Sequence, residues 1–271
     1  SSIGWAQQSW KHIEIGLFSD DEARNLLLET TSSSDHETAG IICELLGNLP
    51  LAIAQAAATA VNEDYSLQRY LARLSQYAYK DVLVPIPCDS YKEGVSKALL
   101  LTVESALTHL NQDQRKAAQE QLYALAFLSQ SGVPTRWLDP TLTDYTEAPS
   151  VNNTAADIQH RSLNALVKAS VVQQSSDRKM TMLHRLQAQA LREHWSPNQT
   201  QQALSEAANT LRRVNIDTLP LNDTNGRREE VLQLIEQLRS IDSQGYSRDL
   251  LQSEHILSCL NHTLVHACNL H

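Results

Sequence analysis

The stretch IICELLGNLPLAIAQAAATAV, residues 41–61, determines how the first part of this chain is expected to fold. One apolar run ends at Gly47, and Pro50 opens a second one three residues later. Proline is tolerated at the first position of a helix because its missing N–H has no helical partner there, and it holds the preceding Leu49 in an extended conformation. Gly47 can take the left-handed conformation that ends a helix. The stretch therefore predicts two helices joined by a sharp corner.

The second of these helices, which begins at Pro50, is apolar on almost every side. Such a helix is expected to be buried all round, because no face of it is suited to water. It should therefore lie at the centre of a helical domain. The residues expected in that core are Leu51, Ile53, Ala54, Ala56, Ala57, Ala58 and Val61.

Helix start signals surround this stretch. Ser19, followed three residues later by Glu22, fits a capping box, and the run SDHE at residues 34–37 repeats the pattern before the helix that ends at Gly47. Apolar residues then recur at helical spacing between residues 66 and 80. Residues 19–90 are therefore predicted to form a helical domain.

Residues 91–197 predict a second, mixed domain. Its pattern is a series of helices followed by two short β-prone runs, 170–174 and 179–183, which the polar turn at 175–178 joins into a hairpin. Helices followed by such a two-stranded wing are typical of a winged-helix domain. The helices are expected at residues 95–110, 112–131, 137–138 and 155–169, and from the end of the hairpin to about residue 195.

The remaining residues, 198–271, continue the helical pattern and are interpreted as a helical linker or the start of a helical array, although no 34-residue repeat is visible. The chain is therefore assigned to the mainly α class. It is expected to contain a helical bundle, a winged-helix domain with a short β-hairpin, and an α-helical C-terminal segment that could begin a repeat. The helices of this last segment are expected at residues 199–213, 229–240 and 250–264.

The composition limits the classes of function. The chain has 271 residues and a formal net charge of −9, whereas general nucleic-acid binders need clustered lysine and arginine. Its four cysteines, Cys43, Cys88, Cys259 and Cys268, are scattered and form no CxxC pair, which indicates reduced thiols and a cytoplasmic protein. No run of 18 apolar residues is present, so no membrane span is expected.

The corner at residues 46–52, LGNLPLA, resembles the GLPLAL motif of the NB-ARC class of STAND nucleotide-binding switches, with Asn48 as an inserted residue. In that family a strand and a helix precede the motif, and residues 13–28 match this lead-in. The resemblance implies that residues 1–18 are the tail of an upstream nucleotide-binding domain. It also implies that Leu49 and Pro50 form a wall beside the adenine of a bound nucleotide.

A second motif stands at the end of the predicted wing. Residues 182–186, MLHRL, resemble the MHD motif in its MHRL form, although Leu183 separates Met182 from His184. In NB-ARC proteins the histidine at this position contacts the β-phosphate of ADP, so the resemblance assigns this contact to His184. Together the two motifs extend the resemblance over residues 13–195.

The resemblance implies the regulatory half of a signalling NTPase. ATP hydrolysis in this family needs a G-x-x-x-x-G-K-[ST] loop, and no glycine of this chain is followed by lysine. This chain alone is therefore expected not to be catalytic, and the full-length protein to be an ATPase switch. Its cofactor would be ADP or ATP, with Mg²⁺ supplied through the P-loop domain. The implied partners are that domain, further copies of the protein on activation, and a protein or other ligand on the C-terminal helical array.

Two other functions fit the sequence. The chain can be an interaction scaffold that binds no nucleotide, in which case His184 only caps the helix after it or hydrogen-bonds across the wing. The winged helix can instead bind DNA, although its expected recognition helix carries only His160, Arg161 and Lys168, set against Asp157. A protein-packing role is the favoured interpretation of this helix.

The C-terminal segment holds several side chains of the types that bind zinc. Imidazole and thiolate are zinc ligands, yet this group lacks a second tight ligand pair and the glutamate of the HExxH motif. No metal site is expected there. The group consists of His255, Cys259, His262, His266 and Cys268.

Overall fold

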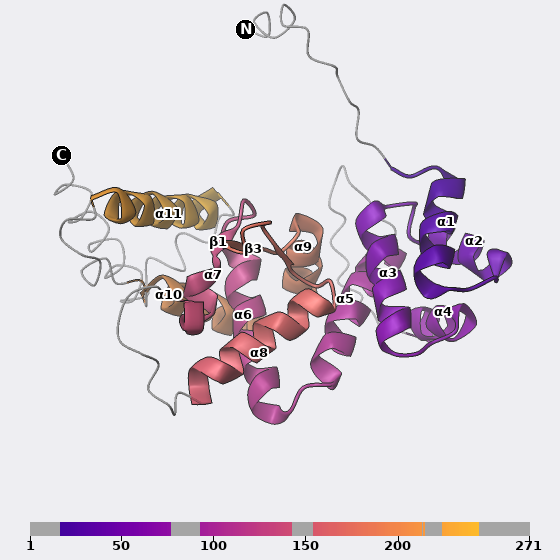
Figure 1. Cartoon of the computed structure of the whole chain (residues 1–271), viewed down its shortest axis with the longest axis horizontal. Coiled ribbons are helices and arrows are strands. Elements are labelled where there is room, and N and C mark those ends of the chain that lie inside the picture. Colours follow the sequence, from indigo (N-terminus) through magenta and orange to yellow (C-terminus); the bar gives the residue numbers. More distant parts are fainter. Residues whose placement is uncertain (1–16, 77–92, 143–153, 213, 215–223, 244–271) are drawn as a thin grey trace, which may run out of the picture.

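The computed structural model describes residues 17–76, 93–142, 154–212, 214 and 224–243. This part of the chain is mainly helical and carries one small antiparallel sheet, which confirms the predicted fold class (Figure 1). Three expectations lie outside it: most of the strand expected in the lead-in, the helix at 250–264, and the histidine–cysteine group beyond residue 254. Within the described residues, no helix is both long and apolar enough to cross a membrane.

Residues 17–76 form an N-terminal helical unit, at the right of Figure 1. α1 packs against α2 and α3, and α4 packs against the same two helices. The series of four helices expected from the sequence is present over these residues. Their bounds are α1 (Asp20–Thr31), α2 (His36–Leu45), α3 (Pro50–Asn62) and α4 (Leu67–Gln76).

Two helix starts show how local sequence sets the element boundaries. At α1 the predicted capping box is complete: the amide of Glu22 donates to Ser19 Oγ over 3.3 Å, and the amide of Ser19 donates to Glu22 Oε2 over 2.8 Å. The second expected box, at residues 34–37, is wrong. Asp35 caps α2 by accepting the Thr38 amide over 3.0 Å, and threonine at this third helical position cannot return the bond as glutamate does.

Helix α3 is not buried on every side, contrary to the expectation from its composition. Ala54 is exposed, Val61 keeps 53% of its surface accessible to solvent, and Leu51 and Ala58 are only partly buried. α1, α4 and α5 pack against α3, and the side chains that these helices do not cover remain accessible to solvent although they are apolar. The other residues predicted in the core, Ile53, Ala56 and Ala57, are fully buried.

Residues 112–194 lie within the region 91–197 for which a winged-helix domain is predicted, and they are called the winged-helix unit below. The predicted hairpin is confirmed, since β2 and β3 pair antiparallel. A third strand, β1, was not predicted; it pairs with the other edge of β3 and gives the sheet order β1–β3–β2. The elements are α6 (Gln112–Phe127), β1 (Val133–Pro134), α7 (Thr135–Leu138), η1 (Pro140–Leu142), α8 (Thr154–Lys168), β2 (Gln173–Gln174), β3 (Met180–Met182) and α9 (Arg185–His194).

Helix α6 ends at Phe127, before residue 131, where the sequence pattern placed its end. Leu128 is already extended, and Gly132 has a φ of +119°, a conformation that favours glycine. This turn directs the chain into β1, where Val133 lies opposite Thr181. Residues 128–131, which the sequence pattern assigned to a helix, therefore connect α6 to the edge strand β1.

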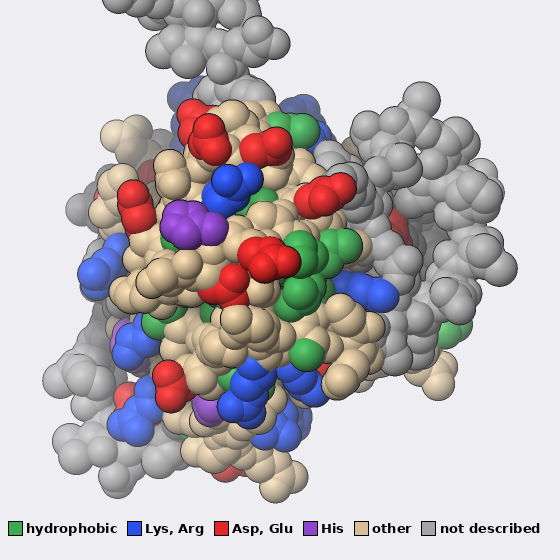
Figure 2. Space-filling model, turned by 90° about the vertical axis from the view of Figure 1, so that its right-hand side faces the viewer, with side chains coloured by type: hydrophobic (Ala, Val, Ile, Leu, Met, Phe, Trp, Pro, Cys, Tyr) green, Lys and Arg blue, Asp and Glu red, His purple; other side chains and the backbone are tan. Residues whose placement is uncertain are grey.

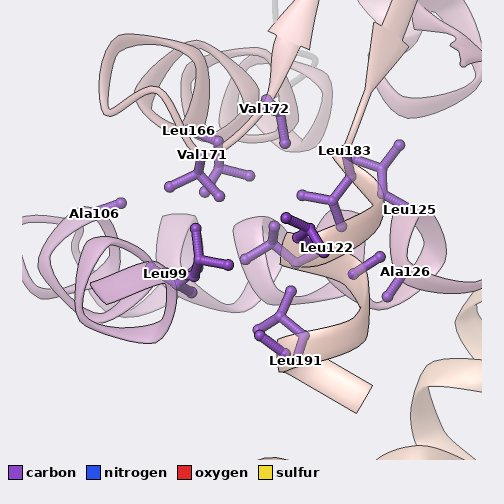
Figure 3. Close-up of a cluster of buried hydrophobic side chains, with 14 of the residues drawn as sticks. Leu99, Ala106, Leu122, Leu125, Ala126, Leu166, Val171, Val172, Leu183 and Leu191 are labelled. Carbon is purple, nitrogen blue, oxygen red and sulfur yellow. The ribbon is translucent and has the colours of Figure 1, made fainter. Parts of the chain in front are cut away.

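Helix α5 (Glu93–Thr108) lies between the two units and packs against α3 and α9. Glycine at position 94 permits the start of α5 to approach the end of α2, because a Cβ there would lie 2.5 Å from the main-chain oxygen of Leu45. The hydrophobic core is continuous from the N-terminal unit through α5 to the winged-helix unit. Figure 3 shows its centre, where Leu99 of α5 meets Leu122, Leu166, Leu183 and Leu191.

Two further helices, α10 (Pro197–Arg212) and α11 (Thr224–Ser243), correspond to those expected at residues 199–213 and 229–240. α10 packs along α6, and the ring of Trp195, just before α10, meets the ring of Tyr123 edge-on with centroids 4.9 Å apart. α11 packs on β1 and so covers that edge of the sheet. Both helices therefore belong to the same packed body as the winged-helix unit.

Four buried glutamine side chains connect elements that are distant in the sequence. Each donates through Nε2 to a main-chain oxygen outside its own helix, and Gln237 also accepts the Ser129 amide over 2.7 Å. Three of the four leave Oε1 buried without a hydrogen-bond partner among the described residues. The bonds run from Gln55 to Ser170 (2.9 Å), from Gln121 to Leu138 (3.1 Å) and Gln159 (2.9 Å), from Gln187 to Leu99 (2.9 Å), and from Gln237 to Gly132 (2.9 Å).

Candidate functional site

The corner between α2 and α3 has the backbone that the sequence predicts. Gly47 (φ 60°) and Asn48 (φ 54°) take the left-handed conformation, and Leu49 is extended (φ −74°, ψ 118°) before Pro50 opens α3. The amide of Asn48 donates to the main-chain oxygen of Cys43 over 3.0 Å, which closes the end of α2. Asparagine tolerates left-handed backbone better than most residues. The residue inserted relative to the GLPLAL pattern is therefore part of the turn that ends the helix.

Asn48 also joins the corner to the residues that precede α1. Its main-chain oxygen accepts the Phe18 amide over 3.1 Å, and its Nδ2 donates to Asp20 Oδ1 over 2.6 Å. Its own Oδ1 is buried and has no hydrogen-bond partner in the described part of the chain. The end of the lead-in, the start of α1 and the start of α3 thus lie together at one end of the helical unit.

The start of α3 presents main-chain donors without a side-chain cap. Leu49 makes no capping hydrogen bond, and the helical ladder begins with the Ile53 amide, which donates to Leu49 O over 3.1 Å. The amides of Leu51 and Ala52 precede this bond, so the helix end carries partial positive charge. Leu49 and Pro50 are partly buried beside it. An apolar surface next to a positive helix end suits an aromatic base linked to a phosphate.

His184 is the N-cap of α9, and one residue, Leu183, separates it from the end of β3. Its backbone is extended (φ −60°, ψ 140°), and its Nδ1 accepts the Leu186 amide over 3.2 Å. The residue is exposed to solvent, although the atoms packed around its ring desolvate it in part. The sequence left two roles open for His184, and the structure shows one of them, the cap of the following helix. Because Nδ1 makes the cap, a contact with phosphate would have to use Nε2.

The cap determines which form of the imidazole ring fits the structure. Nδ1 must carry a lone pair to accept a hydrogen bond, so the contact is satisfied by the neutral ring with its proton on Nε2. Burial and, to a smaller extent, the neighbouring charge of Arg185 hold the pKa of His184 below its ordinary value. The Nε2–H group has no partner among the described residues and is a donor at neutral pH.

Pro50 and His184 lie on different helices, and α5 packs between these helices (Figure 1). Pro50 is the first residue of α3, and His184 directly precedes α9. The structure therefore does not bring the two predicted residues into one hydrogen-bonded group. It does place each of them at the N-terminal end of a helix.

A histidine–aspartate pair was missed by sequence analysis. Nδ1 of His160, on α8, lies 2.6 Å from Oδ2 of the buried Asp139, whose Oδ1 accepts the Thr141 hydroxyl over 2.6 Å. Nε2 of His160 lies 2.8 Å from Nδ2 of Asn164. Both ring nitrogens are therefore occupied, and the pair ties the end of α7 to α8. No sequence signal links residues 21 positions apart on two different elements.

This pairing also changes the expected recognition helix, α8. His160 is turned toward Asp139, which leaves Arg161 and Lys168 exposed on the helix together with the acidic Asp157. The positive surface available to DNA on α8 is therefore small.

Among the residues described by the structure, no group of three side chains could hold a metal ion.

The resemblance to NB-ARC proteins rests on the two sequence motifs alone and stays a prediction. No model of a known protein family matches the chain, and no curated protein is significantly similar to it in sequence.

Proposed function

We propose that this chain is the regulatory half of an NB-ARC-like STAND NTPase, which holds ADP or ATP against a P-loop domain and controls self-association. Leu49 and Pro50 form the wall beside the adenine, and His184 donates from Nε2 to the β-phosphate. The observation that supports this best is that both motifs stand at helix starts, Pro50 at the first position of α3 and His184 at the N-cap of α9. Helix N-termini favour phosphate because of their unpaired amides and partial positive charge.

The neutral ring of His184 suits this role. Its Nε2–H can donate one hydrogen bond to a phosphate oxygen without a net charge on the ring, and the exposed Arg185 adds a positive charge beside it. A closed arrangement makes the contacts of Pro50 and His184 with the nucleotide, and an open arrangement loses them. This difference in contacts biases the switch. Mg²⁺ and the hydrolytic groups belong to the P-loop domain, because this chain has no G-x-x-x-x-G-K-[ST] loop.

The test is ADP binding by a longer form of the protein that includes the P-loop domain. We expect His184→Ala to weaken ADP binding by about 10-fold or more, the effect of losing one hydrogen bond to a charged group. His160→Ala is the matched control, because its ring nitrogens are engaged by Asp139 and Asn164 inside the same unit. Unchanged ADP affinity in a folded His184→Ala protein would remove the assigned role.

A nucleotide-independent interaction scaffold is the second candidate function. Ile41 (45% exposed) and Leu45 (40% exposed) stand one turn apart on α2. Figure 2, which faces this end of the molecule, shows a small group of exposed hydrophobic side chains among charged ones. Exposed apolar patches are typical of protein-binding surfaces. If ADP neither binds to the longer protein nor stabilises it, the scaffold replaces the nucleotide switch.

A further inference from the structure

Gln55 links the N-terminal helical unit directly to the winged-helix unit. Its Nε2 donates to the main-chain oxygen of Ser170 over 2.9 Å, and its side chain is 1% exposed. Elsewhere α5 separates α3 from α9, and the two units meet mainly through that helix. The Gln55 amide therefore connects the N-terminal helical unit directly to the winged-helix unit, whereas most other contacts between these units pass through α5.

Both ends of this bond are connected along the chain to a residue of the proposed nucleotide site. Gln55 stands on α3, little more than one turn after Pro50. Ser170 has a left-handed backbone (φ 59°) in the turn that ends α8, and β2 begins three residues later. The β2–β3 hairpin then leads to His184 at the start of α9. A change at the bond would therefore move one wall of the site relative to the other.

The amide of Gln55 makes one hydrogen bond and leaves one polar atom unpaired. Gln55 lies among the buried alanines of α3, and its Oε1 is buried without a partner among the described residues. An apolar side chain would remove this unpaired oxygen, but it would also take away the donor to the Ser170 carbonyl. The amide restricts the orientation of α3, because its N–H must point at the Ser170 carbonyl to form the hydrogen bond. Buried polar contacts of this kind fix a unique arrangement of packed elements.

We propose that Gln55 is a positioning residue that sets the orientation of the N-terminal helical unit on the winged-helix unit, and through it the spacing between Pro50 and His184. The part of this inference that concerns nucleotide rests on the proposed function. The part that concerns orientation does not, because it follows from the Gln55–Ser170 bond itself.

The test measures the distance between spin labels on the two units of the 271-residue chain, without nucleotide. The labels are placed at exposed Asn25 on α1 and exposed Arg161 on α8, in a background with the native cysteines replaced. Gln55→Met keeps the length of the side chain and removes the donor. Gln121→Met is the matched control, because Gln121 is also buried and its acceptors lie within the winged-helix unit.

We expect Gln55→Met to shift and broaden the distance distribution, and Gln121→Met to leave it as in the parent, with unfolding transitions recorded for both. Should Gln55→Met fail to fold, Gln55→Asn retains the amide but is one methylene too short to reach Ser170, and the same shift is expected. A parent-like distribution in a folded Gln55 variant overturns the inference. A shifted distribution together with absent ADP binding upholds the positioning role and removes the nucleotide switch, so the two proposals fail separately.

Discussion

Replacement of His184 by alanine tests the cap of α9 directly. Removal of a capping side chain costs about 0.5–2 kcal/mol in general. The Nδ1 contact here is 3.2 Å long and the ring is exposed, so we expect a loss in the lower half of that range, about 0.5–1 kcal/mol near pH 8. For a protein of this size, the melting temperature should fall by about 1–4 °C.

His184→Asn adds a comparison that depends on pH, because asparagine caps helices well and does not titrate. The pKa of His184 is lowered in the folded protein, so the unfolded chain binds the proton more readily. The stability that His184 contributes is therefore complete above its unfolded pKa of about 6.5, and it is lost as the pH falls through the lower, folded pKa. Relative to His184→Asn, the parent should lose stability as the pH falls from about 7 to below the folded pKa of His184.

The assay is urea unfolding followed by circular dichroism at both ends of this pH range, for the parent and the two variants. Two results would refute the reasoning. If His184→Ala is as stable as the parent near pH 8, the cap is not formed. If the difference in unfolding free energy between the parent and His184→Asn is the same at every pH, the neutral ring does not accept the capping hydrogen bond. The argument that Nε2 carries the proton for the phosphate contact then fails.

Two further substitutions test buried polar groups. Tyr70 is fully buried, burial raises its pKa, and its hydroxyl has no partner among the described residues, so Tyr70→Phe should be neutral or stabilise the protein by up to about 1 kcal/mol in thermal unfolding. A clear loss of stability would show that the hydroxyl is satisfied. Gln237→Met leaves the Ser129 amide and the Gly132 carbonyl unpaired, which should cost about 2–4 kcal/mol and speed hydrogen exchange in α11. Unchanged exchange of α11 would contradict the role of this side chain in docking the helix.

The features that sequence analysis predicted correctly depend on neighbouring residues. The capping box of Ser19 and Glu22 and the corner from Gly47 to Pro50 are set by local backbone preferences and short hydrogen bonds. The hairpin of β2 and β3 also joins adjacent runs through a short turn. Such elements can be read along the chain because all their partners lie within a few residues.

The features that were missed depend on partners far away in the sequence. Residues of α3 alternate between buried and exposed according to which helices cover them, so Ala54 and Val61 were wrongly placed in the core. The two residues of β1 carry no periodic signal and become a strand only by pairing with β3. The contact of His160 with Asp139 likewise requires η1 to lie against α8. For the candidate site, the sequence allowed a helix cap at His184, but it gave no indication that α5 separates that residue from Pro50.

The buried glutamines have a consequence for the response of the protein to ionic strength. Added salt screens contacts between charges over about 10 Å, but a bond from a neutral amide to a carbonyl involves no net charge. The elements joined by Gln55, Gln121, Gln187 and Gln237 should therefore keep their relative orientation from dilute buffer to concentrated salt. Charged residues on the surface, which give the chain its net charge of −9, can therefore be substituted without changing the orientations that these amide bonds fix.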